Sequence, residues 1–169
     1  AIVGKFPRVL SAQQSSTDTI TDDAAGGVET AFATTFTIPA NFFTANKGLL
    51  VLCGFEKPAS TSPPALTISV RLAGTKHFTS QAEGGIDALR GFGLAVLIMG
   101  TAAPGASVAL FTSLLAGIIM NNTARNTQTY TVNEATNGSL VLTIAALWAS
   151  NVANTHTVRL QSLVVCEIN

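Results

Sequence analysis

From residue 30 onward, the chain is a succession of short runs of β-branched and aromatic residues, separated by Gly, Pro and Asn. Runs of this kind are typical of consecutive β-strands. They predict strands at about 30–38, 48–56, 65–73, 75–80, 90–99, 106–120, 126–132, 139–149 and 156–168. A sheet of such strands can bury its apolar face only by packing against a second sheet. The pattern therefore predicts an all-β fold, an antiparallel β-sandwich of eight or nine strands.

The alternation of side chains predicts which faces meet the core. In the last strand, one face carries Val158, Leu160, Ser162, Val164, Cys166 and Ile168, and the other carries Arg159, Gln161 and Glu167. We expect the first set to face the core. Segment 106–120 also satisfies helical spacing, and we favour a strand there. Asn137-Gly138 and residues 150–155 contain turn residues, which predict hairpins between the strands that they join.

The first 29 residues lack this strand pattern. They are polar and irregular, and Gly26-Gly27 interrupts any period. We expect residues 1–29 to form an extended N-terminal arm and residues 30–169 to form one domain, because 169 residues suit a single core. We expect no targeting segment, since the first residues lack the long apolar core of a secretory signal.

The charge composition argues against several classes of partner. Nine Lys and Arg balance nine Asp and Glu, and only 11% of residues are charged, against roughly 25% in an average soluble domain. A nucleic-acid binder needs clustered Lys and Arg to displace counterions, and no cluster occurs, so we expect no nucleic-acid partner. Hydrophobic residues make up 47% of the chain. This excess in a neutral chain indicates surface reserved for partners, and it predicts a homo-oligomer.

A membrane span is the alternative use of so much apolar sequence. No charged residue occurs between Arg90 and Arg125. The apolar residues there nevertheless divide into 92–99 and 108–120, and each piece is shorter than the roughly 18 residues that cross a bilayer. We interpret both pieces as buried strands and expect no membrane association.

Residues capable of catalysis or metal binding are few and dispersed. The two histidines, His77 and His156, lie at expected strand edges, where we predict a solvent-facing role. The carboxylates show no diagnostic spacing: Asp22, Asp23, Glu29, Glu56, Glu83, Asp87, Glu134 and Glu167. Asp18, Asp22 and Asp23 could hold calcium loosely, but the EF-hand pattern is missing, and a solvated acidic turn is the favoured interpretation. We therefore predict no enzyme, no metal site and no cofactor.

Two glycine motifs and two cysteines are further candidates for functional residues. Gly91-Phe92-Gly93 resembles the start of a dinucleotide-binding loop but lies within an expected strand, and Gly74-Thr75-Lys76 is interpreted as a hairpin turn. Cys53 and Cys166 both fall in apolar strands without metal-ligand spacing. We expect both to be buried thiols that face the core.

Two segments resemble a known family. Residues 29–56 contain Ile38-Pro39-Ala40-Asn41, a short loop and an apolar strand, and residues 140–168 form a closing pair of strands. Both resemble the jelly-roll structural proteins of tailed bacteriophages. The resemblance implies a jelly roll in which the strands of Cys53 and Cys166 are neighbours, so that a disulfide between them is conceivable. It also implies a virion component, often a trimer, without catalytic residues.

The favoured hypothesis is therefore a non-enzymatic virion protein that self-assembles, as a trimer by resemblance. It would attach to a capsid or tail surface, next to other virion proteins, as a decoration or fibre component. A carbohydrate- or receptor-binding jelly roll is the first alternative, with a host glycan or receptor as partner and Trp148, Tyr130 and Phe78 as candidate contacts. A shell-forming capsid protein of a small virus is the second. The arm carries only Lys5 and Arg8, which weakens that alternative because packaging a genome usually requires a basic arm.

Overall fold

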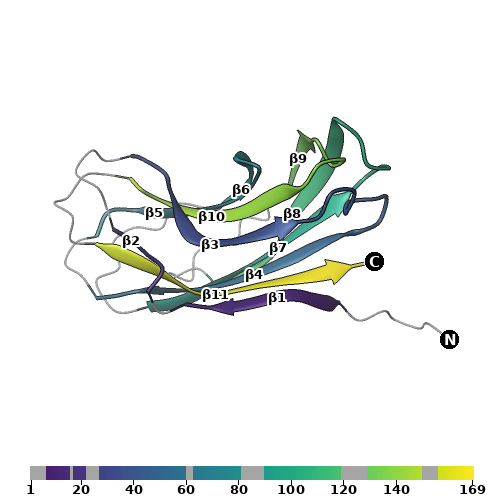
Figure 1. Cartoon of the computed structure of the whole chain (residues 1–169). Helices are drawn as coiled ribbons and strands as arrows, with labels where there is room; N and C mark the ends of the chain where they lie inside the picture. Colours follow the sequence, from purple (N-terminus) through teal and green to yellow (C-terminus); the bar gives the residue numbers. More distant parts are fainter. Residues whose placement is uncertain are drawn as a thin grey trace.

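The computed structural model describes residues 7–15, 17–21, 27–59, 63–80, 90–118, 129–149 and 156–169. Within these ranges the chain forms eleven strands and no helix (Figure 1). The strands are β1 (Arg8–Gln14), β2 (Thr19–Thr21), β3 (Thr30–Ile38), β4 (Gly48–Lys57), β5 (Leu66–Leu72), β6 (Thr75–Thr79), β7 (Arg90–Gly100), β8 (Val108–Ile118), β9 (Thr129–Glu134), β10 (Leu140–Trp148) and β11 (Thr157–Ile168). All nine predicted strands are confirmed, including the one expected at 106–120.

Two antiparallel sheets pack face to face in the order of a jelly roll (Figure 1). The larger sheet has the order β1-β11-β4-β7-β8-β9, with β2 also paired to β11, and the smaller has the order β3-β10-β5-β6. Without β2 and the β8–β9 hairpin, each sheet is four-stranded, and apart from the β5–β6 hairpin the successive connections cross between the sheets as in two Greek keys. The β8–β9 hairpin extends the larger sheet by two strands. The predicted all-β jelly-roll sandwich is confirmed.

The core lies between the sheets and consists of aliphatic and aromatic side chains. Its largest fully buried members include Ile38, Phe43, Leu49, Leu72 and Phe78. Three further phenylalanines form a row, because the Phe55 ring stacks on Phe92 at 4.9 Å and lies 6.0 Å from Phe32. These rings come from both sheets, so they fix how the sheets face each other.

The predicted turns have two different outcomes. Ala73 and Gly74 have φ values of 46° and 86°, as a two-residue hairpin turn requires, and they join β5 to β6. The hairpin predicted at Asn137-Gly138 is wrong, because β9 and β10 belong to different sheets. That turn instead carries the chain between layers. Residues 150–155 lie outside the described residues, and the strands that they join, β10 and β11, also belong to different sheets.

The predicted face of the last strand is correct only for its first half. Leu160 lies opposite Phe55 and Ser162 lies opposite Gly54, so Gln161 is an extra residue in the pairing of β11 with β4. One extra residue reverses the alternation beyond it. After this bulge the core-facing residues are Leu163 and Val165, both fully buried. Ser162, Val164 and Cys166 therefore point to the opposite face.

Two parts of the predicted N-terminal arm are strands. β1 and β2 both pair with β11 and form the edge of the larger sheet. Ile20 of β2 belongs to the core, and Leu10 of β1 packs against it, whereas Val9 is 59% exposed. An edge strand carries polar residues on its solvent side, which explains why this segment resembles a loop in sequence. Residues 1–6, 16 and 22–26 lie outside the described residues.

Candidate functional site

The centre of the outer face of the larger sheet, which points away from the core, is apolar. Pairing places its side chains in three rows across β4, β7 and β11: Leu50 with Leu97 and Cys166, Leu52 with Ala95 and Val164, and Gly48 with Met99 and Ile168. The residues between them in sequence, such as Val51, Val96 and Val165, are fully buried in the core. We call Leu50, Leu52, Ala95, Leu97, Met99, Val164, Cys166 and Ile168 the apolar outer face.

The apolar outer face continues onto β8 and ends in ion pairs. Phe111 lies opposite Met99 in the pairing of β7 with β8 and is 37% exposed. At one end of the strands, Arg159 Nη1 donates to Glu56 Oε1 at 3.0 Å. At the other end, Glu167 pairs with Lys47 at 3.0 Å and with Arg8. These contacts, with the hydrogen bond from Lys47 foremost, hold the pKa of the Glu167 carboxyl below its usual value. An apolar centre with a polar rim is the usual anatomy of a protein interface.

Sequence reasoning missed this face because it searched for alternation. The runs Leu49-Leu50-Val51-Leu52 and Ala95-Val96-Leu97-Ile98-Met99 are apolar at every position. A continuous apolar strand indicates a sheet that is covered on both faces. The signal was therefore present in the sequence, although it does not identify what covers the second face.

The outer face of the smaller sheet is polar. It presents threonines from three strands, among them Thr37, Thr143 and Thr67, together with Arg71 and Lys76. The larger apolar residues of β10 on this face are Val141, which is 41% exposed, and the half-buried Leu147. The sandwich is consequently two-sided, with one apolar and one polar outer face.

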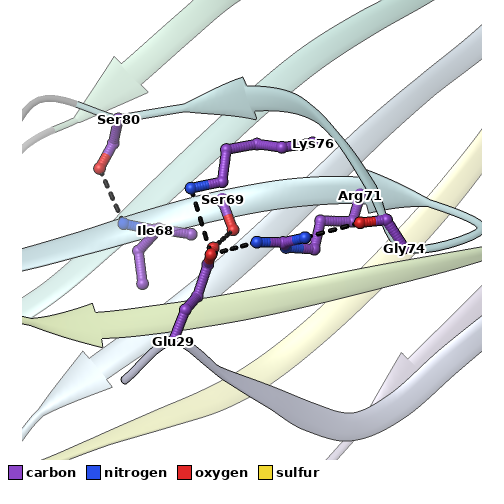
Figure 2. A network of polar contacts seen from close by, with 7 residues as sticks. All are labelled: Glu29, Ile68, Ser69, Arg71, Gly74, Lys76 and Ser80. Carbon is purple, nitrogen blue, oxygen red and sulfur yellow. Dashed lines mark hydrogen bonds and ion pairs between the residues drawn. The ribbon is translucent and has the colours of Figure 1, made fainter. Parts of the chain in front are cut away.

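A carboxylate clasp crosses this polar face (Figure 2). The Glu29 carboxylate, just before β3, accepts hydrogen bonds from Ser69 Oγ, Arg71 Nη2 and Lys76 Nζ, the last at 3.1 Å. It reaches across β10 at Ala145, which lies between Ala31 and Ser69 in the pairing and is 2% exposed. Partial burial opposes ionisation, but the three donors outweigh it and lower the pKa of Glu29 to about 2.

Both histidines are buried, so the prediction that they face solvent is wrong. His77 is 0% exposed and His156 is 2% exposed. In the pairing of β5 with β6, Val70 lies opposite Phe78 and Arg71 lies opposite Lys76, which leaves His77 as an extra residue. A bulge of this kind redirects a side chain, and here both His77 and Phe78 enter the core. His156 lies beside Trp148, with ring centroids 6.0 Å apart.

The His77 ring joins two side chains of the larger sheet. Its Nε2 lies 2.8 Å from Glu134 Oε1 on β9, and its Nδ1 lies 3.5 Å from Thr112 Oγ1 on β8. A hydroxyl, an imidazole and a carboxylate are the residue types of a nucleophilic relay. Thr112 and His77 are both fully buried, however, and Glu134 is 7% exposed. A substrate cannot reach the hydroxyl in this arrangement, so the cluster acts as a link between the sheets.

The acidic candidates do not converge on a cation site. The Asp18 carboxylate accepts hydrogen bonds from the backbone N–H groups of Ala33 at 2.9 Å and Thr34 at 2.7 Å. Both groups lie where β3 bulges away from β10. Asp18 therefore closes the edge of the smaller sheet, while Asp22 and Asp23 lie outside the described residues, as do Glu83 and Asp87. Among the residues that the structure describes, no cluster of three His, Cys, Asp or Glu side chains could hold a metal ion.

The remaining sequence candidates are mostly structural. Phe78 is 1% exposed and Trp148 is 4% exposed, so neither can stack on a sugar. The side chain of Tyr130 is not among those that the structure describes. Gly91-Phe92-Gly93 lies within β7.

Both cysteines are free thiols, and burial raises the pKa of Cys53 to about 12. Cys53 is buried and faces the core as predicted. Cys166 is also buried as predicted, at 6% exposure, but it lies on the apolar outer face, so only its predicted orientation is wrong.

Within the described ranges, no helix is long and apolar enough to cross a membrane. No family model matches the chain, and no curated protein matches it. Two solved structures of infectious bursal disease virus are similar to it, each over 98% of this chain and 34% of the viral chain. The Gt strain gives a TM-score of 0.42 at 17% identity, and the Gx strain gives 0.40 at 19%. The chain thus spans about a third of the length of the chains that it resembles.

Proposed function

We propose that this chain is a non-enzymatic structural protein of a virion that assembles with copies of itself through the apolar outer face. The single observation that carries the proposal is the contrast between the two outer faces. Leu50, Leu97, Met99 and Val164 lie in an uncharged centre of one sheet surface, with ion pairs at its ends, whereas the opposite surface is threonine-rich and carries the Glu29 clasp. A contiguous apolar patch of this kind marks an interaction site.

A second copy of the chain is the partner that fits this face best. The formal net charge is zero, so copies do not repel one another over long distances. None of the eight residues of the apolar outer face is charged, so the faces of three copies can meet around a three-fold axis without burying an unpaired charge. The polar face of each copy then remains in contact with water.

The finer parts of the proposal rest on the resemblance of residues 29–56 and 140–168 to phage jelly-roll proteins. We infer a closed homotrimer that decorates a bacteriophage head or tail, or builds one of its fibres, in contact with other virion proteins. The burial of Phe78 and Trp148 removes two of the three candidate sugar contacts, which disfavours the carbohydrate-binding alternative. A shell-forming role would use the same face. It differs from decoration in that copies of this chain alone would build a closed particle.

Light scattering coupled to size exclusion tests the assembly. We expect the full chain to elute as a multiple of 17.4 kDa, threefold for a trimer, and Leu97→Lys to shift it to monomer. Val141→Lys is the matched control, because it places the same charge on the outer face of the smaller sheet. Circular dichroism verifies that both variants fold. A monomeric parent chain at micromolar concentration, or equal behaviour of the two variants, would refute the proposal, and negative-stain microscopy separates trimers from shells.

A further inference from the structure

Polar contacts join the two sheets at both edges of the sandwich, and the residues that make them differ between the edges. At one edge, Asp18 binds the backbone of β3, and Gln13 Nε2 donates to the Thr35 carbonyl at 3.0 Å. At the other edge, β6 lies beside β8 and β9 (Figure 1), and His77 contacts Glu134 and Thr112 there. The second edge thus depends on a titratable ring.

The neutral imidazole can use both of its ring nitrogens in this link. When Nε2 carries the proton, it donates to the Glu134 carboxylate, and Nδ1 is free to accept the Thr112 hydroxyl. A protonated ring carries hydrogens on both nitrogens, so Nδ1 can no longer accept from Thr112. It also places a charge in a site that excludes water, at a cost that hydrogen bonds offset only in part.

Among the residues that the structure describes, few charged groups lie around the ring. Glu134 is the one that faces it from β9, and β8 contributes the Thr112 hydroxyl. The core-facing residues of β5 are all apolar: Leu66, Ile68, Val70 and Leu72. Arg71 of β5 and Lys76 of β6 bind Glu29 on the outer face. Burial lowers the pKa of His77, and the hydrogen bond and charge of Glu134 oppose that shift only in part.

We propose that His77, Glu134 and Thr112 form a proton-sensitive latch, which holds β6 against the β8–β9 hairpin at neutral pH and releases this edge on acidification. The proposal rests on the arrangement of one chain and does not depend on the proposed function. Because the pKa of His77 is lower in the folded state than in the unfolded state, the folded state resists protonation of this ring. Stabilisation by the latch is present above the unfolded pKa of about 6.5 and is lost as pH falls below it.

Hydrogen exchange on the full chain tests the latch. Rates corrected for intrinsic exchange are measured between pH 7.5 and 5 for peptides covering 75–80 and 129–134, with 158–168 on β11 as reference. Below pH 6.5 we expect the opening constant of the first two peptides to rise by up to tenfold per pH unit, with a smaller rise on β11. His77→Gln should remove this dependence, and His156→Gln, which changes the other buried histidine, should keep it.

Glu134→Gln separates a proton latch from a purely structural contact. Glu134 favours the protonated ring, so replacing its carboxylate by an amide should lower the folded pKa of His77 further. The rise in the opening constant should then still begin at about pH 6.5 but continue to lower pH than in the parent chain. An NMR titration of His77 in the parent chain gives the same answer without any substitution. A His77 midpoint at or above 6.5, an unchanged step in His77→Gln, or exchange that rises equally at β11 would overturn the proposal.

Discussion

Cys53 and Cys166 lie on directly neighbouring strands but point to opposite faces of the larger sheet. Cys53 lies opposite Leu163 and faces the core, whereas Cys166 lies opposite Leu50 on the apolar outer face. The bulge at Gln161 causes this separation, because it reverses the alternation of β11 between the two halves of the strand. A disulfide requires side chains that point toward each other, so the sheet itself keeps these thiols apart.

The thiols should therefore differ in reactivity. We expect mass spectrometry without reductant to find two free thiols, and Cys53 to react with an alkylating reagent only as fast as the protein unfolds. Its burial and its pKa of about 12 both suppress the thiolate. Cys166 is 6% exposed in the single chain, but the side chains that cover it belong to the outer face, so it should react faster in the assembly-deficient Leu97→Lys variant than in the assembled chain. Rapid labelling of Cys53 in the folded chain would contradict its position in the core.

The N-terminal strands should contribute to the stability of the sandwich. Ile20 is 5% exposed within the core, so Ile20→Ala should lower the free energy of unfolding by about 2–4 kcal/mol. Val9→Ala is the control, because Val9 is 59% exposed, and it should change stability by less than about 0.5 kcal/mol. Urea denaturation measures both variants. An Ile20→Ala variant as stable as the parent would mean that this segment is an independent arm.

The positions of the strands could be predicted from sequence because they depend on local composition. Runs such as Leu66–Leu72 and Leu140–Trp148 combine β-branched or aromatic residues with flanking turn residues, and both are strands. The positive φ of Gly74 likewise belongs to a local turn that its sequence specifies. These features required no knowledge of which strands pair.

The faces and partners of the strands could not be predicted to the same extent. A single extra residue, Gln161 in β11 or His77 in β6, decides which side chains enter the core, and a bulge exists only in relation to the paired strand. The latch was missed for this reason, since Thr112, His77 and Glu134 are far apart in sequence. Asn137-Gly138 has hairpin residues but joins two sheets, because tertiary packing determines the partner of β10.

The Glu29 clasp should make stability depend on pH in the acid range. The folded pKa of about 2 lies below the usual 4.5, so the stabilisation is complete above pH 4.5 and is lost as pH falls toward 2. Glu29→Gln should remove this acid dependence and lower the free energy of unfolding at pH 7 by about 1–3 kcal/mol. This range allows for the partial exposure of Arg71 and Lys76. Urea denaturation at pH 7, 4 and 3 measures both effects.

Glu56→Gln provides the comparison for the clasp. Glu56 also forms an ion pair, with Arg159, but both side chains are a third or more exposed. Water screens such pairs, so we expect a loss below about 1 kcal/mol. If the two substitutions cost the same, the clasp would have no special role in holding the start of β3 across β10.

Two glycines on the outer side of the larger sheet should differ sharply in their tolerance of alanine. A Cβ at Gly48 would lie 2.2 Å from the Ile98 carbonyl oxygen and 2.9 Å from Met99 Cα, both backbone atoms. Gly48→Ala should therefore force β4 and β7 apart and lower the free energy of unfolding by about 1–3 kcal/mol. A Cβ at Gly93 would meet the Cys53 carbonyl oxygen at 3.5 Å, an ordinary contact, so Gly93→Ala should be nearly neutral. Thermal and urea unfolding of the two variants test the pairing, and a Gly48→Ala variant as stable as Gly93→Ala would place Gly48 and Met99 in a different register.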